Sequence, residues 1–240
     1  MAGCKKVQSV FGRKKKQPKL ARVERESERI AQLLALHSVD AVIDIGANEG
    51  QYARRLREAG YRGSIVSVEP GAPAHAALSG ACADDPDWAV APRMALGEAA
   101  GEATLHLSNR SDMNSLKPMA AVTSEAFPKA LAAGTDTVEV ARLDAVLDDL
   151  VGKTARRVFV KIDTQGFEAE ILRGAEGVLD RIAGFQLELS LLPLYEGEAT
   201  YLPVLQLLDA LGFELHLVLS GNFSRRLGRQ LQFDGVFFRD

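Results

Sequence analysis

Small residues fill a predicted turn between a strand and a helix near the N-terminal end of the chain. The apolar run 41–45 ends at Gly46, and the turn 46–50 leads into a periodic segment that contains Tyr52 and Leu56. This order predicts a buried parallel strand, a tight turn and a helix. Small residues in such a turn let a ligand approach the backbone and the helix N-terminus.

A carboxylate, Glu69, ends the next predicted strand at residues 64–69. Parallel strands end at the same edge of a sheet, so Glu69 would face a crevice beside the turn 46–50. There it would accept hydrogen bonds from two ribose hydroxyls. The turn and Glu69 together predict a nucleoside site. The alternative is that Gly46 and Gly50 only form a tight turn and that Glu69 is a solvated strand end.

The turn differs from a dinucleotide site. The pattern G-x-G-x-x-G is absent, because Asn48 takes the place of the second glycine and would obstruct a pyrophosphate. Asp44, two positions before Gly46, suits a cationic amino group instead. The chain also has no Tyr-x-x-x-Lys pair. An NAD-dependent oxidoreductase is therefore the alternative rather than the leading interpretation.

Two further strand ends carry candidate catalytic groups. In the strand 158–163, alternation places Lys161 and Asp163 on the same side, and Asp163 points at the crevice from the end of the strand. Glu188 lies between apolar neighbours on the next strand, where burial costs free energy unless the carboxylate is paired or binds a ligand. The alternative is a structural ion pair between Lys161 and Glu188, or a loop capped by Glu188.

Strands and helices alternate along most of the chain, which predicts a parallel sheet with helices on both faces. The first helix is expected at 22–37 and a third strand at 88–96. Residues 101–157 interrupt the alternation with extra strands at 103–107 and 137–142 and a short helix between them. We expect this insertion to be a lid over the substrate.

The last two strands, at 213–219 and 235–239, have no helix between them. Their polar connection, 220–233, suits a β-hairpin and predicts one antiparallel strand in the sheet. Gly174 and Gly177 weaken the helix that follows the strand 158–163, so we expect them to allow close packing against a neighbour.

Four segments resemble the successive motifs of FkbM-type methyltransferases: DIGANEGQY (44–52), SVEP (67–70), KIDTQGFEAEILRGA (161–175) and LELSLLPLYEG (187–197). The resemblance covers roughly residues 40–240. It implies a class I, Rossmann-like, doubly wound α/β sheet of seven strands. It also implies methyl transfer from S-adenosylmethionine to an oxygen, often a sugar hydroxyl.

The same resemblance implies roles for individual residues. The methionine end of the cofactor would be held by Asp44, Gly46, Ala47, Asn48 and Gly50. Glu69 would hold the ribose and Pro70 would flank the adenosine. SDMNSL (111–116) resembles a segment near the substrate, which makes Asn114 and Ser115 substrate candidates.

Methyl transfer to a hydroxyl requires removal of its proton. Asp163 or Glu188 could act as the base, with Lys161 beside them, or a divalent metal could acidify the hydroxyl. The four histidines have no metal-ligand spacing, so any metal ligands are unknown. The expected acceptor is a hydroxyl of a small molecule, glycan or glycolipid.

The composition fits one domain at 21–240 that follows a basic arm at 1–20. Hydrophobic residues make up 47% of the 240-residue chain, yet nowhere do 18 apolar residues run consecutively. The arm has no apolar segment typical of a signal peptide, and the two cysteines form no CxxC pair. We therefore expect a protein of the reducing cytoplasm.

Charge is unevenly distributed. Eight of the 29 lysines and arginines fall in the first 22 positions, which leaves 21 basic and 32 acidic residues after them. The part of the chain after position 22 therefore has a net charge of −11. This charge repels nucleic acid, so no nucleic-acid acceptor is expected. The arm is too polar to fold alone. The arm is either a solvated tail or a contact to the inner membrane face. For the protein as a whole, a non-catalytic docking module is the third interpretation, after the methyltransferase and the oxidoreductase.

Deletion of residues 1–20 distinguishes these interpretations of the arm. A cluster of basic residues beside Val10 and Phe11 would contribute about 1 kcal/mol per basic residue at an anionic membrane. Co-sedimentation with anionic vesicles should then fall on deletion and at high salt, while turnover of a soluble acceptor persists. Full-length protein that never sediments at low salt would leave only the solvated tail, the simpler interpretation because the apolar anchor is small.

Overall fold

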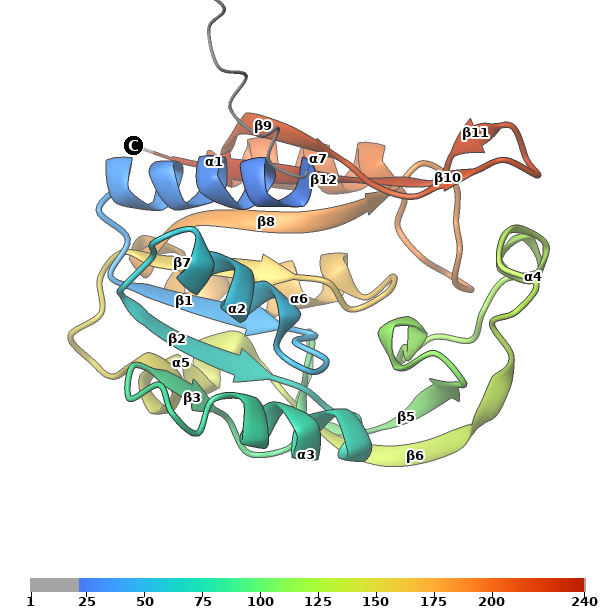
Figure 1. The fold of residues 1–240 in the computed structure, drawn as a ribbon, viewed down its shortest axis with the longest axis horizontal. Helices are drawn as coiled ribbons and strands as arrows, with labels where there is room; N and C mark the ends of the chain where they lie inside the picture. Colours follow the sequence, from blue (N-terminus) through green and yellow to red (C-terminus); the bar gives the residue numbers. More distant parts are fainter. Residues whose placement is uncertain (1–21, 240) are drawn as a thin grey trace, which may run out of the picture.

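Seven strands form the central sheet of the computed structural model, which describes residues 22–239 (Figure 1). The order across the sheet is β3 (Trp88–Val90), β2 (Ser64–Val68), β1 (Ala41–Ile45), β7 (Val158–Ile162), β8 (Ile182–Ser190), β12 (Gln232–Phe238) and β9 (Glu214–Ser220). β12 runs antiparallel to β8 and β9, and the other neighbouring pairs are parallel. The prediction of a mostly parallel sheet with one antiparallel C-terminal strand is confirmed. The predicted arm at 1–20 lies outside the described residues.

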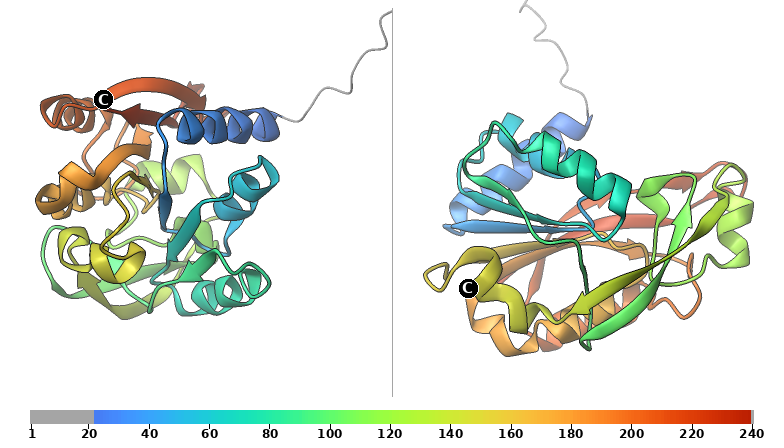
Figure 2. Two further views of the ribbon diagram at one scale, coloured as in Figure 1. Left: turned by 90° about the vertical axis from the view of Figure 1, so that its left-hand side faces the viewer. Right: turned by 90° about the horizontal axis from the view of Figure 1, so that it is seen from below.

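Helices cover both faces of this sheet (Figure 2). One face packs against α1 (Arg22–Leu36), α2 (Gln51–Glu58) and α3 (Ala72–Ala81), and the other against α5 (Leu143–Val151), α6 (Glu168–Gly174) and α7 (Tyr201–Ala210). Alternation along β1 explains the two layers, because Val42 joins the first apolar cluster while Ile43 and Ile45 join the second. No helix within residues 22–239 has the length and apolar content needed to cross a bilayer.

The chain reverses its direction of winding at β1. β2 lies on one side of β1 and β7 on the other, so the connections after β1 and after β7 diverge. Such a switch point leaves a crevice outside the carboxyl ends of the strands, where open α/β sheets bind their ligands. The turn after β1 and the end of β7 therefore border the same crevice.

A second sheet stands beyond these carboxyl ends (Figure 1). It contains β4 (Ala95–Leu96), β6 (Ala132–Ala141) and β5 (Gly101–Ser108), and the turn η1 (Ser111–Met113) and the helix α4 (Ala121–Ala126) lie between β5 and β6. The extra strands and the short helix were predicted. The prediction of a single strand at 88–96 was wrong, because the chain leaves the main sheet after Val90 and β4 pairs with β6.

One helix and one small hairpin were not anticipated. α5 lies inside the range 101–157, yet Leu143 and Leu147 are buried in the main core, so the part that departs from the main fold ends with β6. The connection 220–233 contains a small hairpin of its own, β10 (Phe223–Ser224) and β11 (Arg229–Gln230). α5 is only 9 residues long and falls within the range 101–157 that was predicted as the insertion.

Gly174 and Gly177 allow the close packing that was predicted. A Cβ atom on Gly174 would collide with the carbonyl oxygen of Gly97, which leads into β5. A Cβ atom on Gly177, in the turn η2 (Glu176–Arg181), would lie 3.0 Å from Oδ2 of Asp144. These glycines let α6 and η2 approach the segments beside them.

We expect Gly174→Ala to destabilise the protein by about 1–3 kcal/mol, because the methyl group has no room beside a backbone carbonyl. Gly80→Ala is the matched control, since Gly80 also lies in a helix and a Cβ there meets nothing within 4 Å. The control should gain up to about 1 kcal/mol from helix propensity. Urea unfolding measures both changes, and equal stability of the two variants would contradict the packing argument.

Candidate active site

A cavity of about 290 Å³ lies at the carboxyl ends of β1, β2 and β7. Predicted site residues that line it are Gly46, Ala47, Asn48, Glu69, Pro70, Asn114, Ser115, Lys161 and Asp163. Asp44, Gly50 and Glu188 do not line it. Apolar side chains, among them Leu96 and Phe167, supply further walls. The cavity combines apolar surface with a few polar groups, as small-molecule sites do.

The turn after β1 is held by contacts within the protein. Gly46, Asn48 and Gly50 all have positive φ angles, of 73°, 48° and 84°. A Cβ atom on Gly46 would collide with the carbonyl oxygen of Asp163, and one on Gly50 would lie 2.7 Å from the ring of Trp88. The backbone N–H groups of Gly46 and Ala47 donate to the carbonyl of Val68. The small residues therefore serve close packing, and the N–H groups at 46 and 47 already have partners.

Glu69 joins this turn to the end of β2. Its Oε2 accepts a hydrogen bond from the backbone N–H of Asn48 at 2.8 Å, and its Oε1 accepts one from Gly71 at 2.7 Å. Burial raises the pKa of Glu69, although both N–H groups act in the opposite direction. A carboxylate has about four lone-pair directions, so Glu69 retains acceptor capacity toward the cavity that it lines.

Lys161 occupies the centre of a buried charge cluster. Its Nζ lies 3.1 Å from Oδ1 of Asp44, 3.3 Å from Oδ2 of Asp163 and 3.4 Å from the carbonyl oxygen of Gly46. Burial alone would lower the pKa of Lys161, but the two carboxylates outweigh it and raise this pKa. Burial raises the pKa of Asp44, which is fully buried and faces Lys161. The alternative pairing of Lys161 with Glu188 is wrong.

Glu188 is held by amides. Its Oε2 accepts hydrogen bonds from Nε2 of Gln165 at 2.8 Å and from Nε2 of Gln232 at 2.6 Å. The same Nε2 of Gln165 lies 2.9 Å from Oδ1 of Asp163. Burial, followed by the negative charges of Asp163 and Asp234, raises the pKa of Glu188 well above its usual range. Asp163 lines the cavity with its side chain 37% exposed, so it is the more accessible of the two carboxylates.

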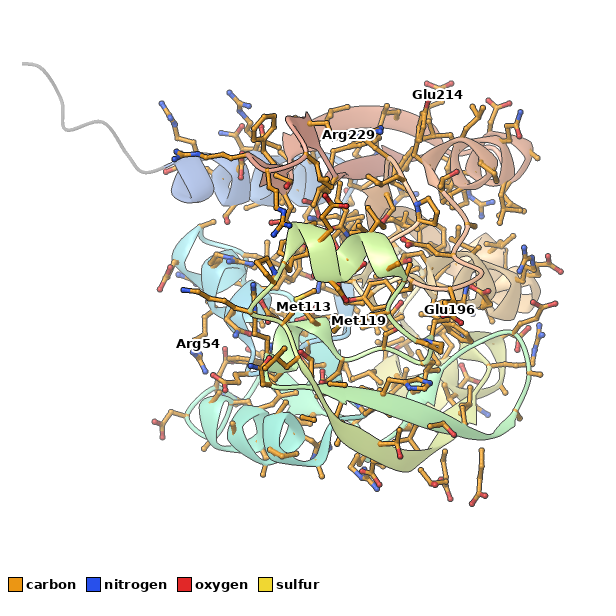
Figure 3. The ribbon with its side chains drawn as sticks, turned by 90° about the vertical axis from the view of Figure 1, so that its right-hand side faces the viewer. Arg54, Met113, Met119, Glu196, Glu214 and Arg229 are labelled. Carbon is orange, nitrogen blue, oxygen red and sulfur yellow. The ribbon has the colours of Figure 1, made fainter. Side chains whose placement is uncertain are left out.

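The segment between β5 and β6 closes one side of the cavity. Ser111 donates from Oγ to Oδ1 of Asn48 at 3.1 Å, and Ser115 donates from Oγ to the carbonyl of Gln165 at 2.7 Å. Asn114 accepts from the backbone N–H of Ser108 at 2.9 Å. Figure 3 looks onto this face and shows Met113 and Met119 between α4 and the second sheet.

Sequence reasoning missed three residues of this network. Gln165 connects Asp163 to Glu188, Gln232 supports Glu188 from β12, and Tyr195 donates from its hydroxyl to Oε1 of Gln165 at 2.9 Å. Gln165 and Tyr195 lie inside two of the segments that carry the family resemblance. Their places in those segments were the available signal, whereas the pairing of β12 with β8 that brings Gln232 near Glu188 has no local signal.

Comparison with protein families identifies the class of protein. The model described as "Methyltransferase FkbM domain" matches residues 44–215, a range that includes the cavity-lining turn, Glu69 and the Lys161 cluster. The chain belongs to the FkbM methyltransferase family. As a member of it, the protein is a methyltransferase that uses S-adenosylmethionine as its cofactor. The NAD-dependent oxidoreductase and the non-catalytic module are therefore set aside.

The fold of this FkbM-family protein is similar to that of a solved structure. A methyltransferase from Thermobifida fusca has 12% sequence identity and a TM-score of 0.50, with 91% of this chain and 80% of that chain covered. The magnesium protoporphyrin IX methyltransferase from Synechocystis PCC 6803, solved with bound SAM, has 9% identity and a TM-score of 0.49, with 90% and 79% covered. No curated protein sequence matches the chain.

Metal ligands are not gathered in the part of the FkbM-family protein that the structure describes. Within residues 22–239, no group of three or more His, Cys, Asp or Glu side chains is arranged to hold a metal ion. The polar groups at the cavity are carboxylates, amides, hydroxyls, the Lys161 ammonium and the Arg55 guanidinium.

We expect Glu69→Ala to weaken the binding of S-adenosylmethionine and S-adenosylhomocysteine by about 10-fold or more. The substitution removes a charged acceptor for the ribose hydroxyls, and hydrogen bonds to charged groups contribute about 1.5–3 kcal/mol. Calorimetry measures both affinities. Glu49→Ala is the control, because Glu49 is an exposed carboxylate in the same turn. Equal affinities of the Glu69 variant and wild type would show that Glu69 does not contact the cofactor.

Proposed function

We propose that the protein methylates a hydroxyl oxygen of a sugar, glycan, glycolipid or related metabolite, with Asp163 as the base. The observation that carries this proposal is the position of Asp163. Its carboxylate lines the cavity, one oxygen accepts from Gln165 and the other lies 3.3 Å from Nζ of Lys161. A base must be within reach of the proton that it removes, and Asp163 meets this condition better than Glu188 does.

The cofactor fits the wall made by the turn after β1 and the end of β2. Asn48 and Glu69 present acceptors there, and Pro70 offers an apolar surface for the adenosine. Asp44 is proposed to act through Lys161, since its carboxylate is buried against that ammonium and does not line the cavity. Gly46 and Ala47 keep the turn close to the ends of β2 and β7.

The residues at the end of β7 account for proton removal. S-adenosylmethionine supplies an electrophilic methyl group on its sulfonium. As the acceptor oxygen forms its bond to this methyl and the bond from sulfur breaks, Asp163 takes the hydroxyl proton. Lys161, whose pKa is raised by its two carboxylate neighbours, remains cationic and lies 3.3 Å from the carboxylate that takes the proton. Correct alignment of the acceptor lowers the barrier further.

A hydroxyl acceptor is favoured by the presence of this base. A sugar hydroxyl has a pKa far above neutrality, so its attack depends on a carboxylate in the cavity. Asn114 and Ser115 line the cavity from the opposite segment and would contact the acceptor there. The net negative charge of the body after the first 22 residues disfavours nucleic acid as the acceptor.

We expect Asp163→Asn to lower kcat by about 100-fold to 10,000-fold, the range for loss of a general base. Affinity for S-adenosylmethionine should stay within a few-fold, because Asp163 would face the acceptor. Methyl transfer from labelled cofactor to a panel of hydroxylated acceptors measures kcat, and calorimetry measures affinity. Asp149→Asn, an exposed position in α5, is the control for the same change elsewhere.

Two results would change the assignment. A large loss of cofactor affinity in Asp163→Asn would move Asp163 to the cofactor site, and undiminished turnover would remove it as the base. The assay is repeated with a chelator, because the proposed mechanism requires no metal. Activity that vanishes with the chelator and returns with magnesium or manganese would support the alternative in which a metal acidifies the hydroxyl.

A further inference from the structure

We propose that Gln165 is a positioning residue that sets the orientation of Asp163 and ties it to closure of the segment over the cavity. The inference rests on the proposed function of Asp163 as the base. Gln165 itself lies in the loop that joins β7 to α6, and both its side chain and its backbone make the contacts that matter.

The side-chain amide of Gln165 has one orientation that satisfies its neighbours. Tyr195 donates its hydroxyl hydrogen to Oε1 at 2.9 Å, and Nε2 faces Oδ1 of Asp163 at 2.9 Å and Oε2 of Glu188 at 2.8 Å. A primary amide has two N–H donors, one for each carboxylate. The reversed amide would place its oxygen against both carboxylates. Gln165 therefore holds one oxygen of Asp163 and leaves the other near Lys161.

The backbone of Gln165 is also constrained. Its φ angle is 57°, a left-handed conformation that costs free energy in a residue with a side chain. The neighbouring residues stabilise this loop, because Oε1 of Glu168 accepts hydrogen bonds from the backbone N–H groups of Thr164 at 3.0 Å and Gly166 at 3.3 Å. A strained conformation held by surrounding contacts is typical of a site where orientation matters.

The segment between β5 and β6 forms a hydrogen bond directly with Gln165. Oγ of Ser115 donates to the carbonyl oxygen of Gln165 at 2.7 Å and accepts from the backbone N–H of Lys117 at 3.0 Å. Ser115 lines the cavity. When this segment closes over a bound acceptor, the contact through Ser115 fixes the peptide whose side chain holds Asp163. Closure and orientation of the base are thereby linked through one residue.

The amide donors also affect the charge state of the carboxylate pair. A hydrogen bond to the ionised form of a carboxylate favours that form, so the N–H donor of Gln165 lowers the pKa of Glu188 against the effect of burial. The charged and titratable groups that face this pair from the elements around it are Asp44, Lys161, Glu168, Tyr195, Glu198 and Asp234. Removing the donors should raise the pKa of Glu188 further, while these other groups stay unchanged.

Two substitutions of nearly equal size test the amide. Gln165→Met removes the donors without adding charge, and Gln165→Glu replaces them with a third carboxylate. The pKa of Glu188, followed by carbon NMR of labelled carboxyl groups, should rise from wild type to Gln165→Met and again to Gln165→Glu. A purely steric role predicts equal Glu188 pKa values in wild type and Gln165→Met, whereas Gln165→Glu adds a negative charge and serves as the positive control for the titration.

Kinetics separate positioning from binding. Gln165→Met should lower kcat by up to about 100-fold, the effect of misplacing a reacting group by roughly 1 Å. Affinity for S-adenosylmethionine should change little, because the amide contacts carboxylates and a tyrosine. Ser115→Ala keeps the amide and should raise KM for the acceptor while the pKa of Glu188 stays at its wild-type value. Gln206→Met, at an exposed position in α7, is the matched control.

The outcomes distinguish this inference from the proposed function. A Glu188 pKa that is equal in wild type and Gln165→Met overturns the role of Gln165, whatever the turnover. Wild-type protein that transfers no methyl group to any hydroxylated acceptor overturns the proposed function, while the NMR titration still reports on the amide. If Gln165→Met unfolds at the assay temperature, Gln165→Leu, which also lacks donors and charge, takes its place in the comparison with wild type.

Discussion

A buried ammonium group between two carboxylates determines how the central strands end. β1 and β7 pair so that Asp44 lies beside Lys161, and Nζ of Lys161 reaches Asp44, Asp163 and the carbonyl of Gly46. A buried charge requires a partner, and loss of one member of such a group costs about 3–5 kcal/mol. This requirement fixes the β1–β7 register at the switch point. It also brings the turn after β1 against the end of β7.

Next to the cluster of Lys161, Asp44 and Asp163, further polar side chains continue across the sheet beneath α2. The hydroxyl of Tyr52 donates to Oε1 of Gln186 at 2.9 Å, and Nε2 of Gln186 donates to Asp234 at 3.3 Å. The Nζ atom of Lys161 lies 5.5 Å from the centre of the Tyr52 ring. Burial raises the pKa of Asp234 to about 6. Polar side chains on neighbouring strands thus connect the cavity to β12, which explains how the sheet accommodates ionisable groups that an apolar core would exclude.

The sequence predicted strand positions better than it predicted partners. Apolar runs and alternation identified β1 and β7 and placed Lys161 and Asp163 on one side, because these are local properties. The pairing of Lys161 with Asp44 depends on the register of strands more than 100 residues apart, which no local pattern shows. The break between β3 and β4 had a signal that was overlooked, since Pro92 interrupts the apolar run and cannot donate to a sheet.

The segment between β5 and β6 is attached in two different ways, and this difference has a physical consequence. Around residues 118–120, backbone bonds join it to the loop at 194–196. Over the cofactor wall, side-chain bonds from Ser111 and Ser115 reach Asn48 and Gln165. Such a bond contributes about 0.5–1.5 kcal/mol net, because water replaces it on opening. Opening of the segment over the cavity would therefore break both side-chain bonds and also the 2.9 Å ion pair between Lys117 and Glu170, while the backbone bonds at 118–120 could persist.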